Sequence, residues 1–94
     1  MLIREIIWLE EVVEKIEWKH NVSVMEVEQL FRSRPSFKKM LAGKIQSEDV
    51  FRALGKTDAG RYLIIFFILK RTNEALIISA RDMDSKERKS YGKK

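Results

Sequence analysis

The sequence predicts an α+β fold, in which two N-terminal helices and a short C-terminal helix pack with a four-stranded antiparallel sheet. The main evidence is an uninterrupted apolar run of eight residues, Tyr62 to Leu69. The run is rich in β-branched and aromatic side chains, and alternate residues of a strand point to opposite faces. Because both sets are apolar, we expect a central strand that is covered on both faces. The run is too short for a membrane-spanning helix, which needs about 20 apolar residues.

The first third of the chain has the pattern of two amphipathic helices. Apolar residues recur at helical spacing over residues 8–20, with glutamates at many of the positions between them. Asn21 is a suitable left-handed stop for this helix. Ser23 and Glu26 have the spacing of a capping box, which predicts the start of the second helix. Residues 2–7 either extend the first helix or precede it in an extended form, since their pattern does not distinguish the two.

Four strands are expected after these helices. The predicted strands are residues 37–42, 50–54, 62–69 and 75–81. The linkers between them are short, which favours antiparallel neighbours, because a parallel crossover needs about a dozen residues or more. Residues 43–47 are expected to form a turn. Asp84 and Glu87 have the spacing of a second capping box, which predicts a short basic helix at the C-terminus.

Charge is distributed unevenly along the chain. Its 94 residues, which we expect to form a single domain, carry a net charge of +5. Residues 1–30 contain three Lys or Arg and seven Glu, a net charge of −4. Residues 31–94 contain sixteen Lys or Arg and seven Asp or Glu, a net charge of +9. A basic half of this strength suits a polyanion such as nucleic acid, although lysines and arginines also solvate ordinary surfaces.

Several classes of site are excluded or unsupported by the sequence. The chain has no cysteine, so it has neither a disulfide framework nor a thiolate metal site. We find no Gly-rich phosphate loop, no metal-ligand spacing and no nucleophile elbow. The N-terminus does not resemble a signal peptide, since Arg4 and Glu5 interrupt its apolar residues. We therefore expect a cytoplasmic protein with no membrane segment, no metal and no cofactor.

The arginines are the most suggestive polar residues. Arg52 and Arg61 lie near facing strands, and Arg81 ends the last strand beside the basic helix. Strict alternation along that strand places Arg81 on the face of Ile77 and Ser79. A guanidinium at such a strand end can present its planar fork to a phosphate, although each arginine alone is also compatible with a plain surface cation.

Short motifs along most of the chain resemble those of a known family. The motifs are Trp8, Lys19-His20, Val22 with Glu28-Gln29-Leu30-Phe31, Glu48-Asp49-Val50-Phe51-Arg52-Ala53-Leu54-Gly55, Gly60-Arg61-Tyr62-Leu63, Ile77-Ile78-Ser79-Ala80-Arg81, and Glu87-Arg88 with Tyr91. Together they resemble the BrnT family of toxins, within the wider RelE-like ribonuclease toxins of bacterial toxin–antitoxin pairs. The C-terminal motif is the most specific of them.

The chain departs from the family pattern at three places. Asn21 replaces the family's glycine, and both residues tolerate left-handed backbone. The polar residues that usually follow the tryptophan are replaced by Leu9-Glu10-Glu11. The arginine before the phenylalanine of the second predicted strand is replaced by Val50. Either Arg52 substitutes for that arginine from the same face, or the site is weakened.

The resemblance implies a RelE-like fold and a metal-independent ribonuclease that inhibits translation. It also implies neutralisation by a small BrnA-like antitoxin, in an assembly compatible with two toxins and two antitoxins. Attack of a ribose 2′-hydroxyl on the neighbouring phosphate needs cations at the phosphate and groups that accept and donate a proton. The implied clamp is Arg61 and Arg81, the proton-transfer candidates are Tyr91, His20 and Glu48, and the expected RNA-binding residues are Arg52, Lys86, Arg88 and Lys89.

Two expectations about partners follow. The antitoxin should place carboxylates against the arginines of the basic face, since opposed charges speed association. The competing interpretation is a non-catalytic module that uses the same basic sheet to bind RNA or an acidic protein.

Overall fold

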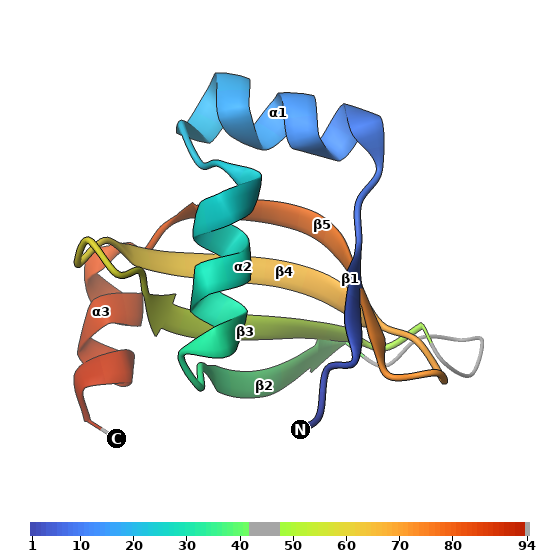
Figure 1. Cartoon of the computed structure of the whole chain (residues 1–94). Coiled ribbons are helices and arrows are strands. Elements are labelled where there is room, and N and C mark those ends of the chain that lie inside the picture. The colour runs from blue at the N-terminus through green and yellow to red at the C-terminus, as the bar shows by residue number, and fades with distance from the viewer. Residues whose placement is uncertain (42–47, 94) are drawn as a thin grey trace.

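The protein folds as one sheet with three helices. The computed structural model describes residues 1–41 and 48–93. Its elements are β1 (Glu5–Ile7), α1 (Glu10–His20), α2 (Val24–Arg32), β2 (Ser36–Leu41), β3 (Val50–Lys56), β4 (Tyr62–Leu69), β5 (Glu74–Asp82) and α3 (Ser85–Gly92). The strand order is β1-β5-β4-β3-β2, with β4 in the middle (Figure 1). Within the described ranges, none of the helices has the length and apolar character needed to span a membrane.

The predicted α+β class is confirmed, and the sheet has one strand more than predicted. The strands β2 to β5 pair as antiparallel neighbours. The correction is β1, which pairs with β5 in parallel and comes from residues whose pattern left their conformation open. A strand of three residues is too short to show an alternation, so its formation depends on the edge that β5 offers. The turn expected at residues 43–47 lies outside the described residues.

The predicted helix ends are confirmed by their hydrogen bonds. Asn21 follows α1 with a φ of 53°, in the left-handed region. The backbone N–H of Glu26 donates to Ser23 Oγ at 3.1 Å, and the N–H of Ser23 donates to Glu26 Oε1 at 3.0 Å. Asp84 and Glu87 form the same reciprocal pair, at 2.8 and 2.9 Å, at the start of α3.

One face of the sheet lies under the two N-terminal helices. α1 packs on β5 and α2 packs on β3 (Figure 1). The fully buried core residues between the two layers are Ile16, Val22, Val27, Leu30, Ala53, Leu63, Ile65, Phe67, Ala75, Ile77 and Ala80. Phe67 is at the centre, with ring centroids of Phe31, Phe37 and Phe51 at 5.4 to 5.9 Å from its own. This layer contains most of the apolar burial that stabilises the fold.

The opposite face of the sheet, called the open face below, is covered less completely. Ile64 is buried there beside Leu54 and Met83, in a small cluster that α3 joins through Tyr91. Phe66 and the neighbouring Ile68 are only half-buried. Cover on both faces of β4 was predicted, and this is correct for the helix side and only partly correct for the open face. Polar side chains of β2, β3 and β5, namely Lys38, Arg52 and Arg81, lie on this face.

Candidate active site

A bulge in β5 decides which face Arg81 occupies. The pairing of β4 with β5 changes from Phe66–Ser79 to Phe67–Ile77, which leaves Ile78 as the extra residue. Ile77 is therefore buried on the helix side, whereas Ser79 and Arg81 lie on the open face. The sequence prediction that Arg81 shares a face with Ile77 was wrong, because a bulge inserts one residue and breaks strict alternation. Lys15 of α1 supports the bulge by donating from Nζ to the Ile78 carbonyl oxygen at 3.1 Å.

Arg81 is held in place on three sides. Its Nη1 and Nη2 donate to the two carboxylate oxygens of Glu87 at 2.8 and 2.9 Å. Nη1 also donates to the carbonyl oxygen of Asp82 at 3.0 Å. The guanidinium carbon lies 5.6 Å from the ring centroid of Phe66, in cation–π range. These contacts fix the plane of the guanidinium over the open face.

The Arg81–Glu87 pair is strongly coupled electrostatically. The hydrogen bonds between the two side chains are the main reason that the pKa of Arg81 is raised and the pKa of Glu87 is lowered. Glu87 is the more enclosed partner, with 12% of its side chain exposed. Both side chains therefore remain ionised over the physiological pH range.

One edge of the Arg81 guanidinium remains available. The Glu87 carboxylate accepts hydrogen bonds from the end formed by Nη1 and Nη2. The Asp82 carbonyl oxygen accepts the second hydrogen bond from Nη1. Within the described part of the chain, the lateral edge formed by Nε–H and the second Nη2–H has no acceptor. This edge has the donor spacing that suits two oxygens of one phosphate.

Arg52 is a second cation on the open face, within electrostatic reach of Glu87. In the sheet register Arg52 pairs with Phe66 on one side and with Lys38 on the other, so all three lie on the open face. Its Nε is buried and has no hydrogen-bond partner among the described residues. Its charge also contributes to the lowered pKa of Glu87, which places the two groups within electrostatic reach. Arg52 and Arg81 therefore flank Glu87 on a single surface.

The start of β4 and α3 together form a second part of the site. Tyr62 is half-buried, and the guanidinium carbon of Arg88 lies 4.3 Å from its ring centroid. Lys56 Nζ lies 5.3 Å from the same centroid, and the Tyr91 ring meets it edge to face at 6.0 Å. A hollow of about 490 Å³ is lined by Tyr62, Ser85, Arg88, Lys89, Tyr91 and Gly92. On β4, Ile64 pairs with Arg81, and Tyr62 lies two residues before Ile64. This corresponds to about 7 Å along the strand.

Arg61, predicted as half of the clamp, has a different environment. Its Nη1 and Nη2 donate to the carbonyl oxygens of Asn21 and His20 at 2.6 and 2.9 Å. Nη1 also donates to Glu26 at 3.1 Å, and Nε donates to Asp82 at 2.8 Å. The hydrogen bond with Asp82 is the main cause of its raised pKa. Arg61 thus ties the end of α1, the start of α2 and the end of β5 together, and its donors are used within the fold.

The remaining predicted residues are divided between this site and other regions. The hollow is lined in part by Arg88, Lys89 and Tyr91. Lys86 lies on the same helix and is exposed. His20 is the last residue of α1, on the helix side. Glu48 is exposed just before β3, at the far end of the sheet from Arg81. The register puts roughly 20 Å between Glu48 and Arg81 along the strand direction. The structure therefore does not bring His20 or Glu48 to Arg81.

Three residues of this site were not predicted from the sequence. Glu87 was identified as a capping residue and as part of a family motif, Tyr62 as a strand residue within another family motif, and Phe66 only as a strand residue; none was assigned a role in the site. The sequence did contain a signal for the Arg81–Glu87 pair. Arg81 ends a predicted strand and Glu87 lies in the first turn of the predicted helix that follows directly, and such a helix brings its first turn back to the strand. Nothing in the alternation of β4 separates the buried Ile64 from the half-buried Phe66.

Comparison with known proteins identifies the family of the chain and a shared fold. Residues 8–87 match the family described as the ribonuclease toxin BrnT of type II toxin–antitoxin systems. The crystal structure of the Brucella abortus ribonuclease toxin BrnT superimposes with a TM-score of 0.61 at 19% sequence identity. The match covers 86% of this chain and 97% of that chain, which shows a shared fold. A search of curated protein sequences gave no match. Since the family match extends over most of the chain, the protein belongs to the BrnT family of ribonuclease toxins of type II toxin–antitoxin systems.

Proposed function

We propose that the protein cleaves RNA without a metal ion, at the open face around Arg81. The observation that carries this proposal is the unused Nε/Nη2 edge of Arg81, whose opposite end is fixed by Glu87. A pre-oriented guanidinium does not need to reorganise when negative charge develops on a phosphate. The cation–π contact with Phe66 and the carboxylate of Glu87 supply this orientation.

The proposed reaction is an internal transfer at phosphorus. The ribose 2′-oxygen forms a bond to the phosphorus while the bond from phosphorus to the 5′-oxygen of the next nucleotide breaks. The 2′-hydroxyl loses its proton to a base, and the leaving 5′-oxygen gains one from an acid. The products are a 2′,3′-cyclic phosphate and a 5′-hydroxyl end. Arg81 would stabilise the phosphorane, where its bonds strengthen relative to the ground state.

Other residues of the open face have supporting roles in this proposal. Arg52 supplies a second positive charge beside the phosphate, and it lies on the same face as Val50, two residues away on β3. It therefore substitutes for the arginine that the family pattern places at position 50. Tyr91 is the remaining candidate for proton transfer at this end of the sheet, and Arg88, Lys86 and Lys89 hold the RNA backbone. His20 and Glu48 are not assigned a part in the reaction.

The biological consequence would be inhibition of translation, relieved by an antitoxin. A type II toxin has a cognate protein antitoxin. We propose that this antitoxin is BrnA-like, that it covers the basic open face with carboxylates, and that the pair assembles with two copies of each chain. Translated RNA lies in the cytoplasm, so the protein would act there.

The deciding experiment is incubation of the purified protein with single-stranded RNA in excess chelator. We expect new fragments that end in 2′,3′-cyclic phosphate and begin with 5′-hydroxyl. Fragments with 3′-hydroxyl ends, or cleavage that disappears with chelator, would overturn the mechanism. Retention of intact RNA without cleavage would instead show a binding module.

A further inference from the structure

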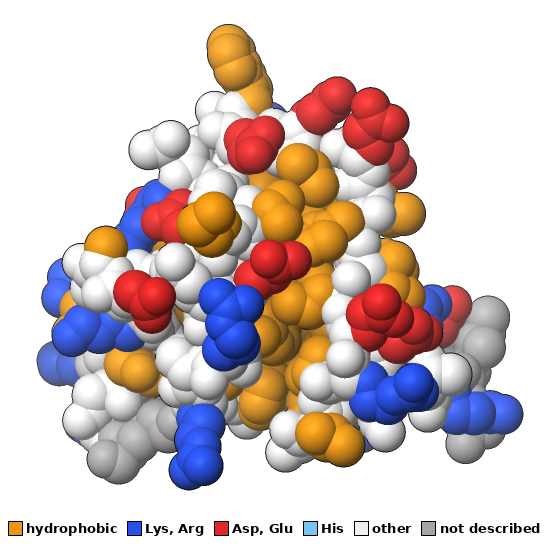
Figure 2. All heavy atoms as spheres, in the orientation of Figure 1, with side chains coloured by type: hydrophobic (Ala, Val, Ile, Leu, Met, Phe, Trp, Pro, Cys, Tyr) orange, Lys and Arg blue, Asp and Glu red, His pale blue; other side chains and the backbone are white. Residues whose placement is uncertain are grey.

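The helix side of the sheet contains a groove with an apolar floor and a charged rim, which the proposed reaction does not use. α1 packs on β5 and α2 packs on β3, so the helices leave uncovered the region between α2 and β1. In the space-filling view a band of hydrophobic atoms runs between these two elements (Figure 2). The groove has a volume of about 780 Å³. It lies on the opposite side of the sheet from Arg81.

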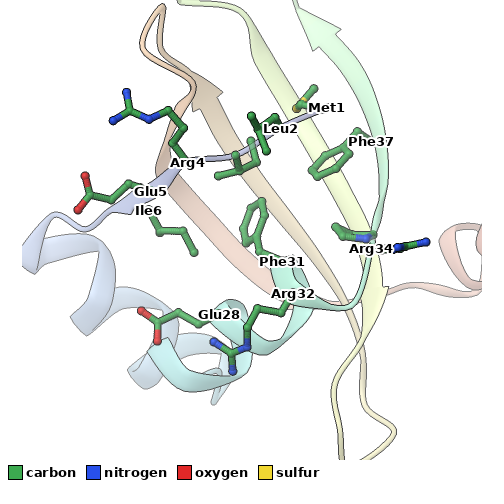
Figure 3. Close-up of a pocket in the computed structure, with 12 residues that line it drawn as sticks. Met1, Leu2, Arg4, Glu5, Ile6, Glu28, Phe31, Arg32, Arg34 and Phe37 are labelled. Carbon is green, nitrogen blue, oxygen red and sulfur yellow. The ribbon is translucent and has the colours of Figure 1, made fainter.

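The floor of this groove is built from apolar side chains that the core only partly buries. Ile6, Phe31 and Phe37 pack against the main core, with part of each side chain exposed. The ring centroids of Phe31 and Phe37 lie 6.2 Å apart. Leu2 is 72% exposed above them, and the side chains of Leu2, Phe31 and Phe37 converge on one space (Figure 3). A contiguous apolar patch with a polar rim is typical of a protein-binding surface.

The rim of the groove has an excess of cations. Arg4 lies on the β1 side, and Arg32 and Arg34 lie on the α2 side, against two carboxylates, Glu5 and Glu28. No ion pair forms at Arg32 or Arg34 within residues 1–41 and 48–93. A segment that carries carboxylates at its edges would therefore gain pairs with arginines on both walls.

The geometry points to this groove as a docking site for an amphipathic segment of the cognate antitoxin, with apolar side chains facing Phe31 and Phe37 and carboxylates facing Arg4 and Arg32. The inference rests on family membership, which supplies the partner, and on the charge and shape of the groove. It adds a contact on the helix side to the expected cover of the open face. An antitoxin that contacts both sides would gain affinity from the groove without competing with RNA for it.

The test measures the affinity of two double variants for the antitoxin encoded by the neighbouring reading frame. The method is calorimetry at low and moderate salt. Leu2→Asp with Arg32→Glu changes two exposed groove residues. Met25→Asp with Lys19→Glu makes the same types of change at exposed positions outside the groove. We expect the groove variant to bind about tenfold more weakly or worse, and the control to bind as the unmodified protein does. Circular dichroism should show that all three are folded.

Four outcomes would overturn the inference. Equal affinity of both variants, with a complex still formed, excludes the groove and leaves the proposed function intact. If sedimentation shows that the protein alone self-associates and that the groove variant does not, the occupant is a second copy. If the protein and its neighbour form no complex, the antitoxin inference fails, whereas RNA cleavage is measured independently. Cleavage lost in the groove variant would link the groove to RNA and not to the antitoxin.

Discussion

Glu87 binds the Arg81 guanidinium with both carboxylate oxygens and also accepts the first backbone N–H of the capping box of α3. One side chain thus fixes both the start of a helix and the plane of an arginine. The capping glutamate of α2, Glu26, has the same double role toward Arg61. The surroundings differ, because Arg61 is enclosed between α1, α2 and β5, whereas one edge of Arg81 faces the open side of the sheet.

Replacement of Arg81 by alanine should reduce RNA cleavage by about 100-fold to 1,000-fold, as for other pre-oriented groups that stabilise transition-state charge. Arg81→Lys should recover only a small part, since an ammonium group cannot match the fork geometry. The alanine variant should also lose about 1–3 kcal/mol of stability, because Glu87 loses its partner. Cleavage rates and urea denaturation of the same samples measure the two effects separately.

The matched control for this prediction is Arg4→Ala, which removes an exposed arginine outside the site. It should leave both the cleavage rate and the stability close to those of the unmodified protein. If Arg81→Ala cleaved RNA at the normal rate, the active site would have to lie elsewhere.

Replacement of Arg61 by alanine should act mainly on stability. The side chain is 24% exposed and joins two helix ends to a strand end, so we expect a loss of about 2–3 kcal/mol, reduced from the fully buried case by solvent screening. Per folded molecule at low temperature, cleavage should be retained. An unchanged melting temperature together with lost cleavage would contradict the structural role and return Arg61 to the catalytic clamp. Lys19→Ala, at an exposed position of α1, serves as the control.

Stability should fall in acid because of Glu87. Its pKa is lowered in the folded protein from an ordinary value of 4.5, chiefly by the hydrogen bonds from Arg81. Its contribution is therefore complete above the unfolded pKa and is lost as the pH falls through the folded pKa. Asp82 acts in the same direction through Arg61, but its side chain is 64% exposed and the effect should be smaller.

Urea midpoints at about pH 7 and about pH 3 test this dependence. Glu87→Gln should be less stable near neutral pH and should lose less stability on acidification than the unmodified protein does. Glu48→Gln, at an exposed carboxylate roughly 20 Å from Arg81 along the strand direction, should behave like the unmodified protein in both respects. A pH dependence that Glu87→Gln leaves unchanged would show that other carboxylates dominate.

Gly55 should be intolerant of a side chain. It is buried on β3 under α2, where an added Cβ would lie 2.7 Å from Leu30 Cγ. We expect Gly55→Ala to cost about 1–3 kcal/mol, as overpacking of a core does. Gly92→Ala is the control, because nothing lies within 4 Å of its added Cβ and alanine favours the helix. Equal melting temperatures for the two variants would mean that α2 can shift away from β3 at little cost.

The sequence by itself determined the features that depend on local chemistry. Both capping boxes, the left-handed stop at Asn21 and the central position of β4 follow from side-chain types at fixed short spacings, so they were predicted correctly. The family motifs around Arg81 and Tyr91 are equally local. Such features need no knowledge of which distant segment packs against them.

Only the tertiary structure decided where the guanidinium groups of Arg61 and Arg81 point and which faces of the sheet are covered. The bulge at Ile78, supported by Lys15 from α1, moves Arg81 to the open face. The enclosure of Arg61 requires the end of one helix, the start of another and Asp82 to meet, and these lie 21 to 41 positions away along the chain. The strand β1 likewise needs the edge of β5. Contacts between distant segments set the direction of each guanidinium, and for this reason two arginines with similar sequence surroundings have different environments.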